Sequence, residues 1–196
     1  YIQFEKEKKW QSVEFIPSNK WNIGVLGIGA IGKHVALSLS NFGYNVMGWS
    51  RSEKNIKEIQ CYYGESGLYK MLPQCKILVC ILPLTQETKH IISKETMSHL
   101  PDGATIINAG RGGHVNEDDL LYMIDKGKIK NAHLDVFETE PLPPNHIFWN
   151  HQKISIWPHI SAETNTETSI DQIVNAARCL MNNTEPPNQI NRLKGY

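Results

Sequence analysis

The feature that most constrains the fold is a glycine-rich turn between an apolar stretch and an amphipathic one. Residues 27–32 read Gly-Ile-Gly-Ala-Ile-Gly, which is the GxGxxG pattern. Residues 22–26 before it are short and apolar, as in a buried strand, and residues 31–42 after it have helical periodicity. The apolar side chains of this expected helix are Ile31, Val35, Leu39 and Phe42. Strand, glycine turn and helix in this order are typical of a dinucleotide-binding unit.

Each glycine has a separate expected role. Gly27 permits the tight turn, Gly29 lets the backbone approach a pyrophosphate, and Gly32 lets the helix pack close to the strand. Ala30 and Ile31 open the helix, whose free N–H groups and partial positive charge favour phosphate. These residues are therefore expected to bind a dinucleotide.

Two other interpretations of this turn are open. A glycine turn can serve packing alone, without any ligand. Gly27 through Lys33 also fits GxxxxGK, the start of a P-loop, but His34 stands where Mg²⁺ binding needs Ser or Thr. The flanking strand and helix favour the dinucleotide over both.

Apolar runs alternate with amphipathic segments along the rest of the chain. Further strands are expected at residues 45–49, 76–82, 104–108, 132–137 and 154–157. A helix is expected after Asn116, with acids in its first turn and Gly127 beyond its end. This alternation predicts the α/β class, a doubly wound parallel sheet of Rossmann type, over residues 19–162.

The end of the second expected strand bears on the choice of cofactor. An NAD site needs a carboxylate about 20 residues beyond the glycine turn, to bind the ribose 2′-hydroxyl. Here Ser50 and Arg51 follow the strand, and the nearest acid is Glu53. A hydroxyl and a guanidinium suit a 2′-phosphate, so NADP(H) is preferred and NAD(H) remains possible. A solvated Arg51 without a ligand is the plain alternative.

Composition excludes several other classes. Hydrophobic residues make up 40% of the 196, which argues against disorder, and the formal net charge is zero, so no basic excess points to nucleic acid or an anionic membrane. The longest apolar run, 77–84, is too short to span a bilayer and contains Pro83. The four cysteines have no zinc spacing, so no metal is expected and a cytoplasmic location fits. The chain starts without Met or a secretory signal, as in a processed product or a fragment.

Three reactive side chains follow the later strands. Arg111, Glu140 and His159 each come shortly after an expected strand, and parallel strands bring such residues to one edge of a sheet. A guanidinium binds a carboxylate with a planar fork, and an imidazole can transfer a proton near neutral pH. Singly, each could be an ordinary loop or surface residue. Together, in this order, they favour a catalytic site.

Five motifs, spread through the chain, resemble one family. GVLGIGAIG, LPLTQET, NAGRGGHVNEDDL, DVFETEPLPP and WPHISAET are similar to the D-isomer-specific 2-hydroxyacid dehydrogenases, especially the glyoxylate/hydroxypyruvate reductase A type. The resemblance covers nearly all of the chain. It implies an NADP-dependent oxidoreductase that transfers a hydride from NADPH to a small 2-oxo acid.

The resemblance also implies roles for individual residues. Arg111 would bind the 2-oxo acid, His159 would donate the proton, and Glu140 would hold the imidazole tautomer and favour its protonated form. Further cofactor contacts would come from Leu82, Pro83, Thr88, Ala109, Gly110, Arg111, Asp135, His159 and Ala162. Gly110 stands where many relatives have a bulkier residue, which suggests a looser loop.

Members of this family have a second, substrate-binding domain, most of which would be missing here. Residues 1–18 and 163–196 resemble the interdomain helix and C-terminal segments that bridge to it. Without that domain we expect cofactor binding with little turnover, and a non-catalytic NAD(P)-binding module is the alternative. The resemblance also implies a homodimer.

Overall fold

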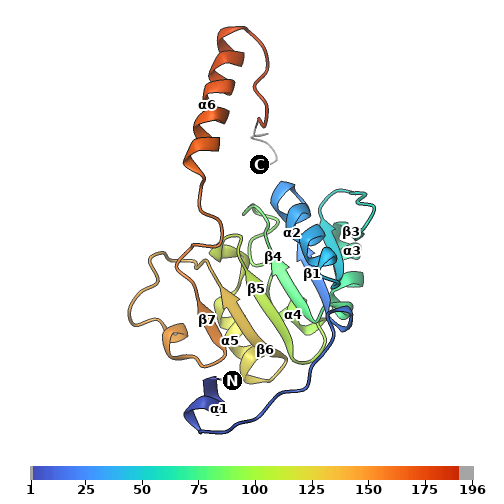
Figure 1. Cartoon of the computed structure of the whole chain (residues 1–196), viewed down its shortest axis with the longest axis vertical. Coiled ribbons are helices and arrows are strands. Elements are labelled where there is room, and N and C mark those ends of the chain that lie inside the picture. The colour runs from blue at the N-terminus through green and yellow to red at the C-terminus, as the bar shows by residue number, and fades with distance from the viewer. Residues whose placement is uncertain (1, 190–196) are drawn as a thin grey trace.

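The computed structural model describes residues 2–189 and contains one seven-stranded sheet (Figure 1). The strands pair in the order β3-β2-β1-β4-β5-β6-β7, and every pairing is parallel. Their bounds are β1 (Asn22–Leu26), β2 (Asn45–Ser50), β3 (Gln60–Tyr63), β4 (Ile77–Cys80), β5 (Ala104–Asn108), β6 (Ile129–Leu134) and β7 (Ile154–Ile156). The predicted α/β class with a parallel sheet is confirmed. The order reverses between β1 and β4, where open α/β sheets bind their ligands.

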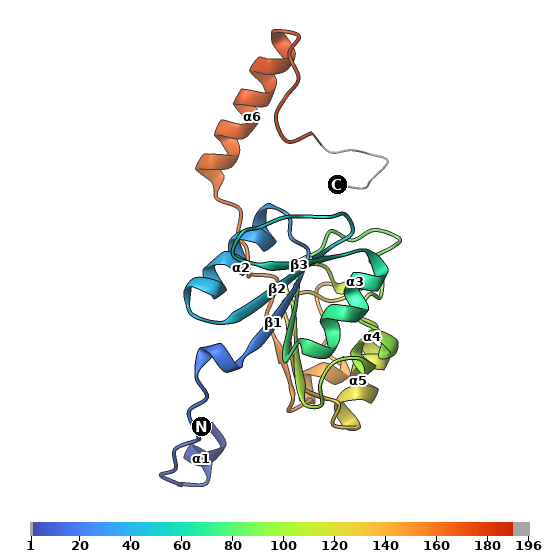
Figure 2. The same cartoon turned by 90° about the vertical axis from the view of Figure 1, so that its right-hand side faces the viewer.

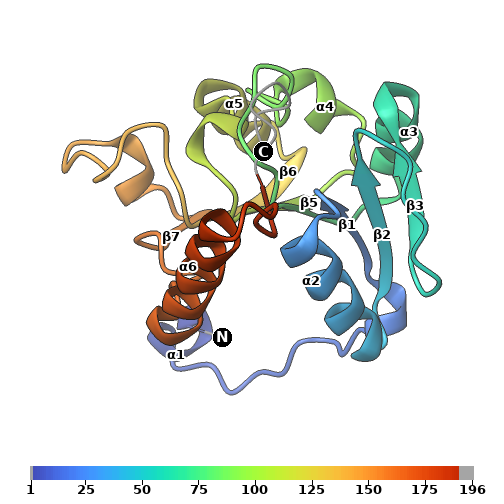
Figure 3. The same ribbon diagram turned by 90° about the horizontal axis from the view of Figure 1, so that it is seen from above.

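Four of the α-helices, those between residues 30 and 125, lie against the two faces of this sheet (Figures 2 and 3). The helix bounds are α1 (Ile2–Lys6), α2 (Ala30–Asn41), α3 (Gly64–Met71), α4 (Lys94–Ser98), α5 (Glu117–Asp125) and α6 (Thr166–Met181). Short 3-10 turns are η1 (Ser18–Lys20), η2 (Leu72–Gln74), η3 (Gly112–His114) and η4 (Ile147–Asn150). In Figures 2 and 3, α3, α4 and α5 cover one face, and α2 lies on the other.

The apolar core forms two clusters, one on each face. The larger one includes Met71, Met97 and Ile124, from or beside α3, α4 and α5, and the smaller one includes Val25 and Ala36 under α2. Because the central strands are covered on both sides, their side chains are apolar in both directions. This double burial explains the near-continuous apolar runs of the sequence.

The buried face of α2 is made of small residues. Gly32 and Ala36 face the sheet, whereas Ile31 is 61% exposed and Phe42 is 74% exposed. A Cβ on Gly32 would lie 1.7 Å from the carbonyl oxygen of Gly27. The helix therefore begins so close to the turn that only small side chains fit between them. The predicted helix is confirmed, and the apolar residues at its two ends, Ile31 and Phe42, lie outside the core.

Other element boundaries also shift. β6 ends at Leu134, so residues 135–137, expected in a strand, instead open the loop that follows. β4 ends at Cys80 rather than at residue 82. β3, α3 and α4 had no periodic signal in the sequence; α3 contains Gly64 and Gly67, and β3 is only four residues long.

The two ends of the chain differ from the sheet domain. α6 extends away from it (Figure 1), and none of its residues is buried. Its exposed apolar side chains include Ile170, Ile173, Leu180 and Met181. α6 lies within the segment 163–196 that was expected to bridge to another domain, and residues 190–196 of that segment lie outside the described part. No helix among the described residues is long and apolar enough to cross a membrane.

Candidate active site

The glycine turn has the geometry that its three glycines predict. Gly27 adopts a φ of +101°, and its amide donates to the Trp49 carbonyl oxygen at 2.9 Å. A Cβ there would lie 2.8 Å from the backbone oxygen of Ile81. A Cβ on Gly29 would have no atom within 4 Å, so this position faces open space at the start of α2. Ala30 and Ile31 follow it in the exposed first turn of the helix.

A cavity of about 970 Å³ lies beside this turn. It extends over the carboxyl ends of β1, β2 and β4, at the point where the strand order reverses. Its lining includes Gly29, Trp49, Arg51, Leu82, Pro83 and Thr88. This volume is at the upper end for small-molecule sites.

The wall of the cavity after β2 carries two cations. Arg51 and Lys54 both line it, and sequence reasoning missed Lys54, three residues beyond Arg51. Ser50 is buried, and its hydroxyl donates to the Ser52 carbonyl oxygen at 2.7 Å. Glu87 also lines the cavity; its pKa is lowered by a hydrogen bond from the Thr85 side chain and, less strongly, by the charge of Arg51. No acid occupies the position after β2 that would suit an NAD ribose.

The loop after β4 is held by its own hydroxyl groups. Thr88 Oγ1 donates to the Pro83 carbonyl oxygen at 2.8 Å and accepts from the Thr85 amide at 2.8 Å. Leu82 is buried at the start of this loop. Leu82, Pro83 and Thr88 therefore present a fixed wall to the cavity, as a cofactor-contacting loop would.

Arg111 follows β5 in a loop whose backbone is hydrogen-bonded on both sides. Its carbonyl oxygen accepts from Asn108 Nδ2 at 2.9 Å, and its amide donates to His114 Nδ1 at 3.0 Å. The guanidinium is solvent-exposed and donates through Nη1 to the Gly110 carbonyl oxygen at 2.7 Å. Ala109 precedes this turn, and its amide donates to the Cys80 carbonyl oxygen at 3.1 Å.

His159 and Glu140 form a hydrogen-bonded pair. His159 Nδ1 lies 2.7 Å from Glu140 Oε2, and Glu140 Oε1 accepts from the Phe137 amide at 2.9 Å. Partial desolvation opposes ionisation of Glu140, but the hydrogen bonds from His159 and Phe137, with the charges of His159 and Arg111, lower its pKa overall. Since Nδ1 faces the carboxylate, Nε2 of this half-exposed imidazole is left for another partner.

A buried carboxylate fixes the backbone that presents His159. His159 has a φ of +56°, in the left-handed region that few residues other than glycine adopt. Asp135 is 5% exposed; its carboxylate oxygens accept from the amides of Ile160 and Ser161 at 2.8 and 3.1 Å, and its carbonyl oxygen accepts from the His159 amide at 2.9 Å. The surrounding structure thus stabilises a strained conformation of the kind found at active sites. Ala162 follows directly, exposed to solvent.

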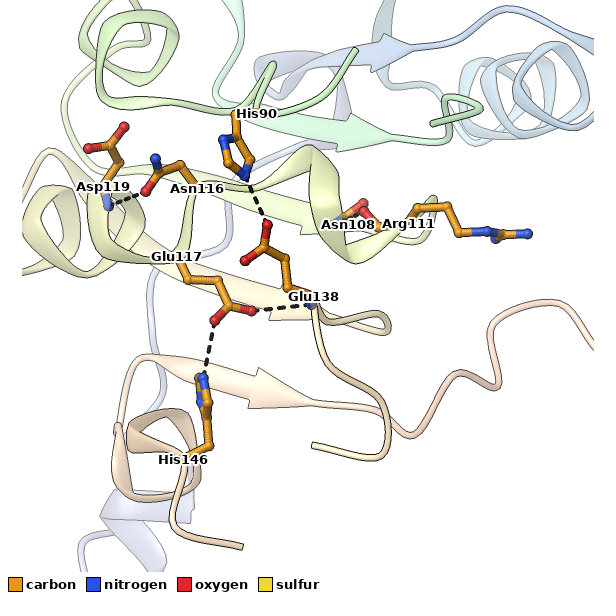
Figure 4. A network of polar contacts seen from close by, with 8 residues as sticks. All are labelled: His90, Asn108, Arg111, Asn116, Glu117, Asp119, Glu138 and His146. Atoms are coloured by element: carbon orange, nitrogen blue, oxygen red, sulfur yellow. Dashed lines mark hydrogen bonds and ion pairs between the residues drawn. The ribbon is translucent and has the colours of Figure 1, made fainter. Parts of the chain in front are cut away.

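Two histidine–glutamate pairs fasten the loop that carries Glu140 (Figure 4). His90 Nε2 lies 3.0 Å from Glu138 Oε1, and His146 Nε2 lies 3.1 Å from Glu117 Oε2. Glu117 Oε1 also accepts from the Glu138 amide at 3.5 Å. Figure 4 shows the Arg111 side chain pointing away from these pairs. Sequence reasoning gave none of these contacts, because the partners are 21 to 48 residues apart.

The predicted residues therefore gather in two places along one edge of the sheet. Arg111, Glu140 and His159 follow β5, β6 and β7, which are adjacent, and Arg111 lies close enough to Glu140 to lower its pKa. The cavity lies beside β1, β2 and β4, and none of these three residues lines it. Among residues 2–189, no three His, Cys, Asp or Glu side chains gather as a metal-binding group.

A family model covers most of the chain. The model for the D-isomer specific 2-hydroxyacid dehydrogenase NAD-binding domain matches residues 1–161. Among curated proteins, glyoxylate/hydroxypyruvate reductase A of Serratia proteamaculans (strain 568) is 38% identical over 196 residues, which is all of this chain and 63% of that protein. The chain thus spans less than two thirds of the length of this relative.

Solved structures of similar proteins have the same fold. A D-isomer specific 2-hydroxyacid dehydrogenase from Xanthobacter autotrophicus Py2, in complex with NADPH and MES, superposes with a TM-score of 0.97 at 35% identity, over 100% of this chain and 81% of that one. An NADPH-dependent glyoxylate/hydroxypyruvate reductase from Sinorhizobium meliloti, in complex with NADP and sulfate, superposes with a TM-score of 0.95. The sequence identity is 29%, and the match covers 100% of this chain and 63% of that one.

Proposed function

Because the chain belongs to the D-isomer specific 2-hydroxyacid dehydrogenase family, we propose that it is the cofactor-binding part of an NADPH-dependent reductase of small 2-oxo acids. Glyoxylate and hydroxypyruvate are the proposed substrates, by analogy with the relatives from Serratia and Sinorhizobium. Residues 19–162 would form the cofactor domain. Residues 1–18 and 163–196 would bridge to a substrate domain, consistent with the unburied helix α6.

The cofactor would lie along the carboxyl edge of the sheet. Its pyrophosphate would approach Gly29 and the first turn of α2, where a side chain would otherwise project. The 2′-phosphate would bind near Arg51 and Lys54, two cations on the cavity wall. The nicotinamide would then extend toward β5, β6 and β7. NADP(H) is favoured over NAD(H) by these charges and by the bound NADP(H) in the two relatives with solved structures.

The side chains after β5, β6 and β7 would bind the substrate and transfer the proton. The bound cofactor supplies the hydride. Arg111 would bind the substrate carboxylate with its guanidinium fork, and His159 Nε2 would donate a proton to the oxygen of the carbonyl that is reduced. Glu140 would hold Nδ1 and stabilise the imidazolium before transfer. Proton transfer of this kind contributes roughly 10²–10⁴ in rate.

The observation that carries this proposal is the 2.7 Å contact between His159 Nδ1 and Glu140 Oε2. This contact leaves His159 Nε2 available to a substrate beside the carboxyl ends of β5, β6 and β7. In the longer protein that contains this chain, His159→Ala should lower kcat for glyoxylate at least 100-fold, with NADPH affinity within about twofold of wild type. His151→Ala is the matched control, since His151 pairs only loosely with Asp125, at 3.9 Å. Loss of NADPH binding in His159→Ala would instead assign this residue to the fold.

A non-catalytic NAD(P)-binding module is the second candidate, favoured for this chain by its 63% coverage of the Serratia relative. NADPH oxidation with glyoxylate, measured on the longer protein and on this chain side by side, separates the two. Turnover by the longer protein alone would leave this chain as a binding module. Absence of turnover in both would refute the enzyme. A cytoplasmic homodimer belongs to the same proposal, and light scattering tests the dimer.

A further inference from the structure

His114 is a fully buried imidazole in the loop that carries Arg111. It ends η3 (Gly112–His114) and has an exposed fraction of 0%. Within residues 2–189, its Nε2 is the buried side-chain nitrogen or oxygen without a hydrogen-bond partner. The hydrogen bond that this ring makes within its own loop is at its other nitrogen, Nδ1.

The other nitrogen fixes the protonation of the ring. His114 Nδ1 accepts from the Arg111 amide at 3.0 Å, so it carries no proton, and the proton of the neutral ring is on Nε2. Desolvation by burial lowers the pKa of His114, and the nearby charge of Arg111 lowers it further, while backbone groups of Pro83 and Arg111 oppose this. The ring is thus kept neutral, as an acceptor for the Arg111 amide must be.

This acceptor completes the support of the Arg111 peptide groups. The carbonyl oxygen of Arg111 accepts from Asn108 Nδ2 at 2.9 Å, while its amide is held by His114. The His114 carbonyl oxygen in turn accepts from the Ile92 amide at 2.9 Å, which ties the loop to the chain after β4. The exposed guanidinium thus projects from a backbone that is fixed on both sides.

The ring occupies space that Gly110 provides. A Cβ on Gly110 would lie 3.0 Å from both Cε1 and Nδ1 of His114 and 3.1 Å from the Leu82 carbonyl oxygen. Either contact is tighter than side chains normally make. Glycine at this position therefore leaves room for the imidazole under the loop. The expectation of a looser loop stays a prediction.

We propose that His114 is a positioning residue, which orients the Arg111 guanidinium through the Arg111 amide and depends on Gly110 for its place. The inference rests on the proposed role of Arg111 in binding a 2-oxo acid. It assigns to a neutral, Nε2-protonated histidine the task of holding the substrate-binding arginine in register with His159.

Two substitutions of His114 separate positioning from simple filling of the core. In His114→Asn, the side-chain oxygen can replace Nδ1 as acceptor; in His114→Leu, no acceptor remains. A net hydrogen bond of about 0.5–1.5 kcal/mol corresponds to a factor of roughly 2–10. In the longer protein, we expect His114→Leu to raise the KM for glyoxylate by up to about tenfold. His114→Asn should have a KM close to that of wild type. In both variants the Kd of NADPH should stay within about twofold of wild type. Gly110→Ala, whose Cβ would lie 3.0 Å from the ring, should change KM in the same direction as His114→Leu.

A second measurement requires no turnover. With ¹⁵N-labelled histidine, NMR of this chain should show His114 with a proton on Nε2 and none on Nδ1 from pH 7 to pH 8. A proton on Nδ1, or an imidazolium in that range, would overturn the inference, even if His114→Leu fails to fold. Wild-type turnover with KM unchanged in His114→Leu would also overturn it, while leaving the proposed function intact. Absence of wild-type turnover with glyoxylate would overturn the proposed function instead.

Discussion

Two glycines of the turn, Gly29 and Gly32, give opposite predictions for the same substitution to alanine. A Cβ on Gly32 would lie 1.7 Å from the Gly27 carbonyl oxygen, whereas ordinary contact begins at 3.4 Å, so α2 or the turn must move. Overpacking of this kind destabilises by about 1–3 kcal/mol, and better helix propensity returns about 1 kcal/mol. Because the close approach is to a backbone atom, the upper end of this overpacking range applies, and Gly32→Ala should lower the free energy of unfolding by a net amount of about 2 kcal/mol and Tm by roughly 4–8 °C.

Gly29→Ala should act on the cofactor and not on the fold. Its backbone, with φ −80° and ψ −160°, suits alanine, and its Cβ would meet no protein atom within 4 Å. The unfolding free energy should change by less than about 1 kcal/mol, as for a modest change of N-cap. If the pyrophosphate occupies this space, one charge-assisted hydrogen bond of about 1.5–3 kcal/mol is lost, and NADPH affinity falls roughly 10–150-fold.

Both effects can be measured on this chain alone. Thermal and denaturant unfolding give the stability of the two variants, and energy transfer from Trp49, which lines the cavity, to NADPH gives the affinity. The expected result is a stable Gly29→Ala with weak binding and a destabilised Gly32→Ala. A Gly29→Ala variant that binds NADPH as tightly as wild type would refute the placement of the pyrophosphate. A Gly32→Ala variant that melts with wild type would refute the close packing of α2.

Three further predictions concern charge. In parallel titrations, Arg51→Ala should weaken the binding of NADPH at least tenfold more than the binding of NADH, because only NADPH carries the 2′-phosphate. Equal losses of affinity would show that Arg51 does not bind this phosphate. The pKa of Glu140 is lowered in the fold, so its stabilising contribution is present above the ordinary glutamate pKa and is lost as pH falls through the folded value. Between about pH 5 and pH 3, wild type should thus lose more unfolding free energy than Glu140→Gln, and parallel pH curves would contradict this. Burial raises the pKa of Cys75 and Cys80 to about 12, so neither should react with iodoacetamide at pH 8 until the chain unfolds; rapid labelling of the native chain, seen by mass spectrometry, would disprove it.

The carboxylates around His159 act in different ways. Asp135 is buried and binds backbone amides, so it fixes the course of the chain through His159. Glu140 is more exposed and binds the imidazole itself, so it acts on the tautomer of that ring. The family resemblance suggested Asp135 as a cofactor contact, which stays a prediction. In the structure, its two oxygens already hold the loop that presents the catalytic candidate.

The sequence by itself determined the class of fold and the identity of the candidate residues. Both depend on short-range patterns: the glycine spacing at residues 27–32, apolar runs the length of a strand, and single reactive residues just after them. Such patterns follow from local backbone geometry and from burial on both faces of a parallel sheet. They can therefore be recognised from residues that are close to one another in the sequence. Arg111, Glu140 and His159 were identified in this way.

Only the tertiary structure decided how these residues meet and what holds them. The strand order makes β5, β6 and β7 adjacent, and thereby brings together side chains up to 48 residues apart. The inward face of α2, the support of His159 by Asp135 and the place of His114 beneath Gly110 all depend on contacts between distant segments. No periodicity encodes such contacts, because hydrogen-bond partners and steric limits are set by the packing of one element on another.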